Sequence, residues 1–214
     1  MTDIIIVCAG SVAVEVYYEI YAINEKAKSE GREEKYNVLG FLSDVENALE
    51  KYPYVESKIL GNIKDWKPIG DEKYALGIAT PKSKQKIVEL LKSRGCKFET
   101  IISPDTIIRP HVKIGEGCFI AANNICAGAE IGNFVNIMGS MIGGESIIGD
   151  YSTTLGFTNI ANGKLGKRVY VGSHAVVLDV EVGDDATVGV GSIVLRKVKA
   201  GTKVFGNPAI KYDF

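Results

Sequence analysis

One repeat dominates the second half of the chain, and its period is 17 residues. An aliphatic residue followed by glycine recurs five times at that spacing: Ile114-Gly115, Ile131-Gly132, Ile148-Gly149, Leu165-Gly166 and Val182-Gly183. Between these pairs lie six-residue units, each with an aliphatic residue, often a glycine or alanine after it, two variable residues and then a small residue. A fixed period of this length indicates stacked repeats that bury their apolar sides against one another.

The six-residue units predict a triangular coil. Three short strands make one turn, the aliphatic residue of each unit points inward, and glycine and other small residues allow the corners. One side of each turn is shorter by one residue, which gives a period of 17 rather than 18. We therefore expect a parallel β-solenoid from about residue 101 to residue 208. Its expected inward positions are Ile102, Ile108, Ile114, Ile120, Ile131, Ile137, Leu165, Val171, Val177, Val182, Val188 and Val194.

The first hundred residues have a different composition. They hold only seven of the 24 glycines but 31 of the 51 charged residues. So large a change near residue 100 predicts two units, residues 1–100 and 101–214.

Alternating strands and helices, in the order β-α-β-α-β-α, are expected in the first unit. The strand runs are short, continuous and apolar, as in strands that are covered on both faces. The predicted elements are strands at residues 4–7, 37–42, 74–79 and 96–102 and helices at about residues 13–28 and 82–94. This alternation predicts a small parallel sheet.

Composition argues against several classes of protein. The net charge of -1 lacks the basic excess of a nucleic-acid-binding protein. No apolar run reaches the ~18 residues of a membrane span. The N-terminus has neither a basic region nor a signal-peptide cleavage site, so we expect a cytoplasmic protein. The four cysteines show no CxxC spacing, which favours free thiols over disulfides or metal ligands.

The repeats resemble those of the hexapeptide acyltransferases, whose coils form a left-handed parallel β-helix. An α/β unit before the coils and a closing Gly-Asn-Pro-Ala at residues 206–209 narrow the resemblance. Over nearly its whole length the chain is similar to the sialic-acid O-acetyltransferase and bacillosamine N-acetyltransferase group. The resemblance implies a Rossmann-like domain that binds a nucleotide-sugar, a β-helix acyltransferase domain, acyl-CoA as co-substrate, a homotrimer with sites between subunits, and a role in surface-glycan biosynthesis.

The first strand–helix turn carries the implied nucleotide site. The group has Gly-Ala-Gly/Ser-Gly-His-Gly here, whereas residues 8–13 read Cys-Ala-Gly-Ser-Val-Ala. Backbone N–H groups of Ala9, Gly10 and Ser11 at a helix start can still meet phosphate oxygens, and the Ser11 hydroxyl can donate. Asp44 resembles the acid with which the group meets the base or ribose. A plain strand–helix connection is the alternative.

The usual catalytic histidine is missing. The group carries His-Asp/Glu-x-x-Ile-Gly-Asp/Glu, whereas residues 144–150 read Gly-Glu-Ser-Ile-Ile-Gly-Asp, which puts Gly144 at the histidine position. A second histidine of the group would fall near Thr153. A free amine needs a general base less than a hydroxyl does, so the loss favours an aminosugar acceptor or a variant mechanism.

Two residues remain as candidates for the chemistry. Glu145, beside the vacated position, is the candidate base. Asn136 lies one residue out of register with an asparagine of the group and is a candidate to orient the acceptor. A solvated surface carboxylate and a structural corner asparagine are the alternatives that the sequence leaves open.

The chain has two histidines, His111 and His174. Two imidazoles cannot make the three-histidine zinc site of the carbonic anhydrases that share this fold, so we expect no metal. His174 occupies a variable corner position, and a surface histidine without a role is the favoured interpretation.

Charge along the coils suggests where coenzyme A binds. From Ile114 to Gly163 there are four acids and no Lys or Arg, whereas eight basic residues follow. The phosphates of coenzyme A need cationic partners, and the acidic coils would attract a cationic aminosugar. An unevenly charged, solvated surface is the alternative. The candidates to hold the cofactor are the backbone at Gly163 and Gly191 and the side chains of Arg168, Arg196, Lys197 and Lys203.

The leading hypothesis is therefore an acyl-CoA-dependent N-acyltransferase that acts on a nucleotide-linked aminosugar. A sugar O-acetyltransferase is the first alternative, and product mapping to an ester would select it. A non-catalytic protein that binds or assembles sugar nucleotides is the second alternative, because the turn is altered and the histidine is absent.

Overall fold

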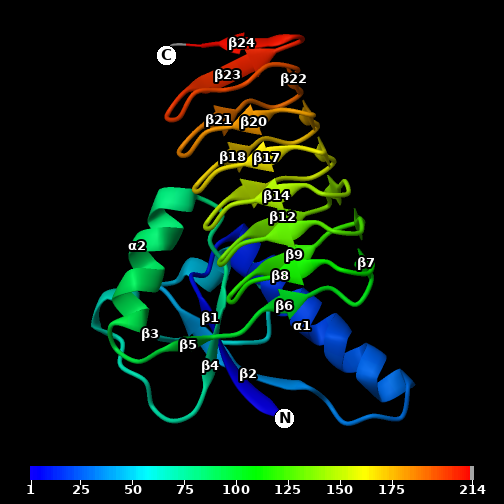
Figure 1. Ribbon diagram of the computed structural model, residues 1–214. Coiled ribbons are helices and arrows are strands. Elements are labelled where there is room, and N and C mark those ends of the chain that lie inside the picture. Colours follow the sequence, from blue (N-terminus) through cyan, green and yellow to red (C-terminus); the bar gives the residue numbers. More distant parts are fainter. Residues whose placement is uncertain (213–214) are drawn as a thin grey trace.

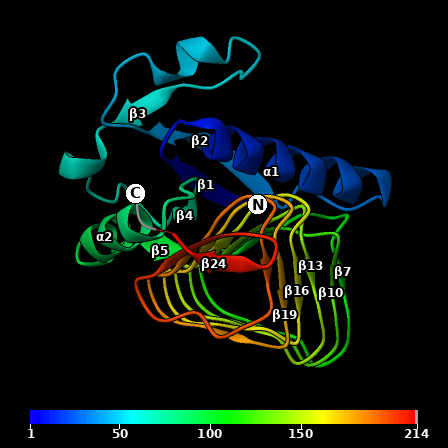
Figure 2. The same ribbon diagram turned by 90° about the horizontal axis from the view of Figure 1, so that it is seen from above.

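The structure, a computed structural model, describes residues 1–212 of the 214-residue chain. An α/β unit lies beside the first coils of a β-helix, whose last coils rise away from it (Figure 1). Seen along its axis, the β-helix has a triangular outline, and the α/β unit flanks it on one side (Figure 2).

The α/β unit is built on a five-stranded parallel sheet in the order β3-β2-β1-β4-β5. Its elements are β1 (Thr2–Val7), α1 (Ser11–Ser29), β2 (Tyr36–Leu42), β3 (Ile59–Gly61), β4 (Lys73–Leu76), α2 (Pro81–Lys92) and β5 (Lys97–Phe98). The central strand β1 is apolar on both faces, because Ile4 and Ile6 pack on the α1 side while Ile5 and Val7 pack on the α2 side. The predicted parallel sheet is confirmed.

The expected helix between the second and third predicted strands is wrong. Between β2 and β4 the described chain forms two 3₁₀ turns, η1 (Ala48–Lys51) and η2 (Ile63–Asp65), on either side of the short strand β3. Neither turn offers an apolar stripe long enough to cover a sheet face. Residues 43–48 are left at the edge of the sheet, where they line a pocket.

The strand expected over residues 96–102 is divided between two sheets. β5 ends at Phe98, and β6 begins at Ile101. The N–H of Glu99 still donates to the sheet, at the carbonyl of Tyr74, whereas the N–H of Ile101 donates to Cys118 in the next coil. The change of hydrogen-bond partner marks where the chain passes from the α/β unit to the β-helix.

The β-helix has three parallel faces. Face I contains β6 (Ile101–Ile102), β9 (Phe119–Ala121), β12 (Asn136–Met138), β15 (Thr153–Thr154), β18 (Tyr170–Val171), β21 (Thr187–Val188) and β23 (Lys203–Gly206), with β24 (Ala209–Lys211) antiparallel at its end. Face II contains β7 (Ile107–Ile108), β10 (Asn124–Ile125), β13 (Met141–Ile142), β16 (Asn159–Ala161), β19 (Val176–Leu178) and β22 (Ile193–Val194). Face III contains β8 (Lys113–Ile114), β11 (Glu130–Ile131), β14 (Ile147–Ile148), β17 (Lys164–Leu165) and β20 (Glu181–Val182).

Strand register reproduces the 17-residue period. Ile137 pairs with Ile120 in the coil before it and with Thr154 in the coil after it. The predicted inward residues fill the centre of the β-helix, and most of them are fully buried. Ile108 is the clear exception, with 41% of its surface exposed, because the first coil has no coil beneath it.

Corners stack into edges with the same period. At the edge between faces II and III the corner residues His111, Gly128, Glu145, Asn162 and Asp179 all have positive φ. Residues of the α/β unit cover face I from outside, including its inner strands β9, β12 and β15. In a triangular coil the II–III edge lies opposite face I, so the α/β unit and the II–III edge are on opposite sides.

Candidate active site

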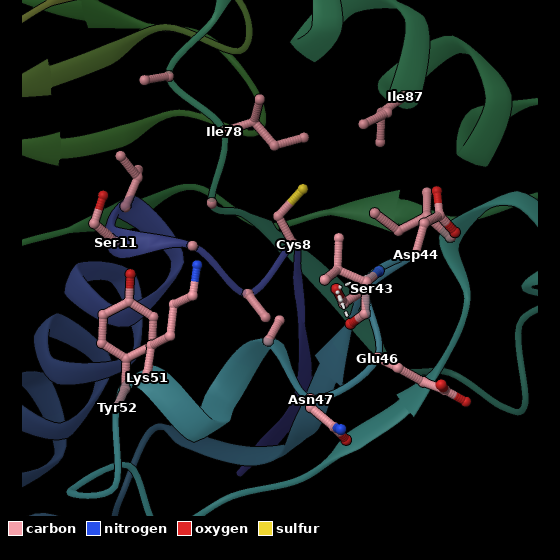
Figure 3. Close-up of a pocket in the computed structure, with 18 residues that line it drawn as sticks. Cys8, Ser11, Ser43, Asp44, Glu46, Asn47, Lys51, Tyr52, Ile78 and Ile87 are labelled. Atoms are coloured by element: carbon pink, nitrogen blue, oxygen red, sulfur yellow. Dashed lines mark hydrogen bonds between the residues drawn. The ribbon is translucent and has the colours of Figure 1, made fainter.

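A pocket of about 600 Å³ opens at the carboxyl ends of β1, β2 and β4. Three segments provide most of its lining: the β1–α1 turn, residues 43–48 after β2, and residues 77–79 after β4 (Figure 3). The chain connects β1 to β2 on one side, while β4 pairs with the other side of β1. The edge of a parallel sheet at such a reversal of strand order is where α/β proteins bind ligands.

One end of the pocket suits an anion. α1 begins at Ser11 after Gly10, with no side-chain cap and no acidic residue in its first turn. The first N–H groups of a helix have no partner within the helix, and its dipole favours negative charge there. Lys51 and Tyr52 lie at the same end of the pocket as Ser11 (Figure 3). This end therefore combines open N–H groups, a hydroxyl and an ammonium.

The opposite end is acidic. Asp44 and Glu46 line it, and the N–H of Lys64 donates to the Asp44 carboxylate at 3.2 Å. The Ser43 hydroxyl donates to the carbonyl of Val45 at 2.9 Å, which shapes the turn after β2. A carboxylate held in this way can accept hydrogen bonds from hydroxyl or amine groups of a ligand.

Cys8 lies between the two ends, in the left-handed region with φ of 76°. Burial and then the charge of Asp44 raise the pKa of its thiol to about 11, so the side chain is a neutral thiol at physiological pH. The structure brings Ala9, Gly10, Ser11 and Asp44 together in this one pocket, as the sequence predicted. Their contact with a nucleotide stays a prediction.

Glu145 lies far from this pocket within one chain. It is an exposed corner residue of the II–III edge, and Gly144 precedes it there. Its carboxylate packs against Gly128 one coil below, where an added Cβ would be 2.2 Å from Glu145 Oε1. Only glycine at residue 128 leaves room for this position of the carboxylate.

Asn136 does not contact solvent, so it could orient an acceptor only through other residues. Its side chain is fully buried, and its amide group donates to the carbonyl of Ile78 at 3.0 Å. Ile78 lines the pocket. Asn136 therefore reaches the pocket only through the backbone after β4.

Lys84 was not singled out from the sequence. Its side chain is fully buried between α2 and face I. Its ammonium donates to Asn136 Oδ1 at 3.0 Å, to Thr153 Oγ1 at 3.0 Å and to the carbonyl of Ser152 at 3.1 Å. Helical periodicity carries the missed signal, since residue 84 shares a face of α2 with buried Val88 and Leu91.

The residues predicted to hold coenzyme A fall into separate places. Gly163, Arg196 and Lys197 lie at or near the II–III edge, and Lys197 pairs with Glu181 at 2.6 Å. Gly163 is buried, and its N–H makes no hydrogen bond within residues 1–212. Gly191 lies at another edge, and its N–H already donates to the carbonyl of Ser173. The N–H of Gly191 itself is therefore occupied, and a role of the backbone near Gly191 in holding coenzyme A stays a prediction.

Arg168 and Lys203 line a second cavity, of about 480 Å³, between the start of α2 and the late coils. Two nitrogens of Arg168 donate to the carboxylate of Asp185 at 2.8 Å each. This pairing lowers the pKa of Asp185 and partly neutralises the arginine. A phosphate would have to compete with Asp185 for Arg168.

Solved structures of acetyltransferases share this architecture from end to end. A point mutant of perosamine N-acetyltransferase from Caulobacter crescentus, in complex with CoA and GDP-perosamine, aligns with a TM-score of 0.80 and 19% identity, over 100% of this chain and 98% of that one. WeeI from Acinetobacter baumannii aligns with a TM-score of 0.80 and 24% identity, over 99% and 100% of the two chains. The protein has the left-handed β-helix fold of the hexapeptide-repeat acetyltransferases.

Sequence relatives with this type of repeat match only part of the chain. Serine acetyltransferase from Synechococcus elongatus is 34% identical over an alignment of 111 residues that covers 47% of this chain and 40% of that protein. Bifunctional protein GlmU from Clostridium beijerinckii is 29% identical over 46% of this chain and 25% of its own length. The chain thus spans less than half the length of these relatives. No family model matches it.

Two features of other protein classes do not occur in residues 1–212. No helix in this part of the chain has both the length and the apolar composition to cross a bilayer. Nor do these residues contain a cluster of three or more His, Cys, Asp or Glu side chains placed to hold a metal ion.

His174 stacks on Phe157 at a corner between faces I and II, with ring centroids 5.0 Å apart.

Proposed function

We propose that the protein transfers an acetyl group from acetyl-CoA to the amino group of a nucleotide-linked aminosugar, as a step of surface-glycan synthesis in the cytoplasm. One observation carries this proposal. A pocket with a cationic and an acidic end lies at the carboxyl edge of the parallel sheet, in a chain that aligns over its whole length with a perosamine N-acetyltransferase bound to CoA and GDP-perosamine.

The two ends of the pocket suit the two charged parts of a sugar nucleotide. The diphosphate would lie at the start of α1, where the N–H groups near Gly10 and Ser11 and the ammonium of Lys51 face it. Asp44, at the other end, would accept hydrogen bonds from the ribose hydroxyls or the base. The sugar would then extend out of the pocket toward the acetyl donor.

The II–III edge offers the groups that acetyl transfer needs. The amine attacks the thioester carbonyl, a C–N bond forms, the C–S bond breaks, and the thiolate leaves as the amine loses a proton. Glu145 would accept that proton, because it is the exposed carboxylate beside the vacated histidine position. The N–H of Gly163 would donate to the carbonyl oxygen as negative charge develops there. Gly163 lies one coil above Glu145, since its carbonyl accepts the N–H of Ile147 at 3.0 Å.

Acyl-CoA would run along the same edge toward the late coils. Parallel strands are spaced ~4.8 Å apart, so Arg196, three coils above Glu145, lies ~14 Å along the edge. Arg196 forms no ion pair within the described part of the chain, whereas Lys197 is paired with Glu181. Arg196 is therefore the better candidate to meet a phosphate group. Arg168 and Lys203 could contribute only from a neighbouring subunit.

The separation of the two halves of the site supports the expected homotrimer. The pocket lies on the side of face I, whereas Glu145 lies on the opposite edge of the same β-helix. An aminosugar held in the pocket of one chain therefore reaches Glu145 of another chain, and rotational symmetry would repeat this site at each interface.

The direct test offers acetyl-CoA with UDP-, GDP- and dTDP-linked aminosugars and measures the free thiol released. We expect thiol release with at least one of them and an amide in the NMR spectrum of the product. An ester product would instead select the O-acetyltransferase alternative. Absence of turnover with the whole panel, together with absence of coenzyme A binding by calorimetry, would refute the proposal and favour a non-catalytic binding protein.

A mixing experiment tests the shared site. Ser11→Trp would fill the anion end of the pocket, and Glu145→Gln would remove the proposed base, so each variant alone should be nearly inactive. Co-expression at equal amounts should restore about a quarter of wild-type activity, because that share of interfaces combines an intact pocket with an intact edge. A mixture no more active than its components would contradict a site between subunits.

A further inference from the structure

Lys84 is a buried amino group without a buried anion beside it. The residue projects from α2 into the seam between the α/β unit and the β-helix and has no exposed surface. Its hydrogen-bond acceptors are an amide oxygen, a hydroxyl and a backbone carbonyl, and it forms no ion pair within residues 1–212. Burying an ammonium group without an acid is costly, so this lysine is not explained by stability.

Its contacts lead to the wall of the pocket. Asn136 accepts a hydrogen bond from Lys84 and donates one to the carbonyl of Ile78 at 3.0 Å. Thr153 likewise accepts from Lys84 and donates to the carbonyl of Ala79 at 2.6 Å. Ile78 and Ala79 both line the pocket. Two parallel relays therefore join one ammonium group to two successive residues of the wall.

The direction of these hydrogen bonds depends on Lys84. Lys84 donates in both hydrogen bonds, so Asn136 turns its oxygen toward the amino group of Lys84 and leaves its amide nitrogen for the carbonyl of Ile78. In the same way, the Thr153 hydroxyl accepts a hydrogen bond from Lys84 and donates its own hydrogen to the carbonyl of Ala79. Without the lysine, both side chains lose the partner that fixes their orientation.

The wall is held on its other side by close packing. A Cβ on Gly77 would be 2.4 Å from the Cβ of Ala13 in the first turn of α1, so only glycine allows this approach. Residues 77–79 are thus held between the start of α1, which is the anion end of the pocket, and face I of the β-helix. A shift of this segment would change the shape of the pocket.

We infer that Lys84 is a positioning residue that sets residues 77–79 through Asn136 and Thr153 and thereby tunes the binding of the nucleotide-linked sugar. The ligand named here rests on the proposed function. The same relays join the pocket to β12 and β15, which belong to the coils that carry Glu145 and Gly163 respectively.

Lys84→Met tests the inference, with Lys86→Met as the matched control because residue 86 is an exposed lysine on the same helix. We expect Lys84→Met to raise KM for the nucleotide aminosugar at least about tenfold while KM for acetyl-CoA stays within about twofold. Lys86→Met should leave both constants unchanged. A general loss of folded protein would instead lower kcat without separating the two KM values, and equal KM values for Lys84→Met and wild type would overturn the inference.

A double-mutant cycle tests the relay itself. Thr153→Val removes one acceptor of Lys84 and one donor to the wall. If Lys84 acts through Thr153, the double variant should raise KM less than the product of the two single effects, because both changes break the same path. Independent, multiplicative effects on KM would contradict the relay.

Hydrogen exchange separates this inference from the proposed function. In the free protein, Lys84→Met should speed amide exchange in residues 77–80 at least about tenfold, and Lys86→Met should not. If wild type transfers no acetyl group but exchange changes as expected, the proposed function is wrong and the positioning role of Lys84 stands. Unchanged exchange in Lys84→Met would refute the positioning role whatever the activity.

Discussion

Lys84 should make the free energy of unfolding rise with pH. Burial lowers the pKa of its ammonium group from 10.5 to about 7, and the neighbouring Cys118 opposes this shift. In the unfolded chain the lysine keeps its proton up to about pH 10.5, whereas in the folded protein it releases the proton above about pH 7. Between these values the unfolded state binds more protons, so raising the pH favours the folded state.

The size of the effect follows from the two pKa values. Between pH 6 and pH 9, a native pKa of 7 adds about 3 kcal/mol to the free energy of unfolding. A native pKa one unit higher would add about 1 kcal/mol over the same interval. Even the smaller value exceeds the error of a careful denaturant titration.

Urea unfolding at pH 6, 7, 8 and 9 measures this dependence in wild type and in Lys84→Met. The buried thiol of Cys8, whose pKa is raised to about 11, is distant from the change and cancels in the difference. Cys118 is coupled to Lys84, but burial raises its pKa to about 11, so it stays protonated over most of this pH range. Wild-type stability relative to Lys84→Met should rise by at least about 1 kcal/mol from pH 6 to pH 9. A difference that does not change with pH would refute a depressed pKa at Lys84, and Lys86→Met should run parallel to wild type.

Four other predictions follow from the site and the fold. Glu145→Gln should lower kcat by about 100-fold with little change in either KM, if Glu145 takes the proton, and an unchanged kcat would remove it from the mechanism. Lys51→Met should raise KM for the nucleotide aminosugar about tenfold, as calorimetry with the nucleotide diphosphate alone can check, and equal binding would exclude Lys51 from the phosphate end. Gly77→Ala should lower the free energy of unfolding in urea by about 1–3 kcal/mol, because the added Cβ would overlap Ala13. Unchanged stability would show that α1 can move away from residue 77 at little cost. Ile137→Ala in the β-helix core should cost about 2–5 kcal/mol, whereas the same change at exposed Ile108 should cost much less, and similar losses would contradict the inward register.

The β-helix was predictable because its information is local and repeated. The 17-residue spacing of aliphatic-Gly pairs fixes the strand register, and Ile120, Ile137 and Thr154 align in the structure as that spacing requires. The α/β unit was predictable in type but not in detail. Its expected middle helix is absent, because a single connection between two parallel strands can be made by 3₁₀ turns and a short strand as well as by a helix.

Part of the candidate site could likewise be predicted from the sequence, and part of it could not. The turn at residues 8–11 and the acid at Asp44 could be found from sequence, because each follows a strand whose carboxyl end is the binding edge of a parallel sheet. The corner position of Glu145 also follows from the repeat. The role of Asn136 could not be found, because its burial depends on α2 packing against face I.

The sequence by itself determined the coils, their register, the parallel sheet and the corner position of Gly144 and Glu145. Only the tertiary structure decided that Lys84 is buried against Asn136 and Thr153, and that the pocket and Glu145 lie on opposite sides of one chain. The physical reason is the range of the interactions. The repeat is encoded by residues that are close together in the sequence. The contact between Lys84 and Thr153 forms only when the α/β unit packs against the β-helix.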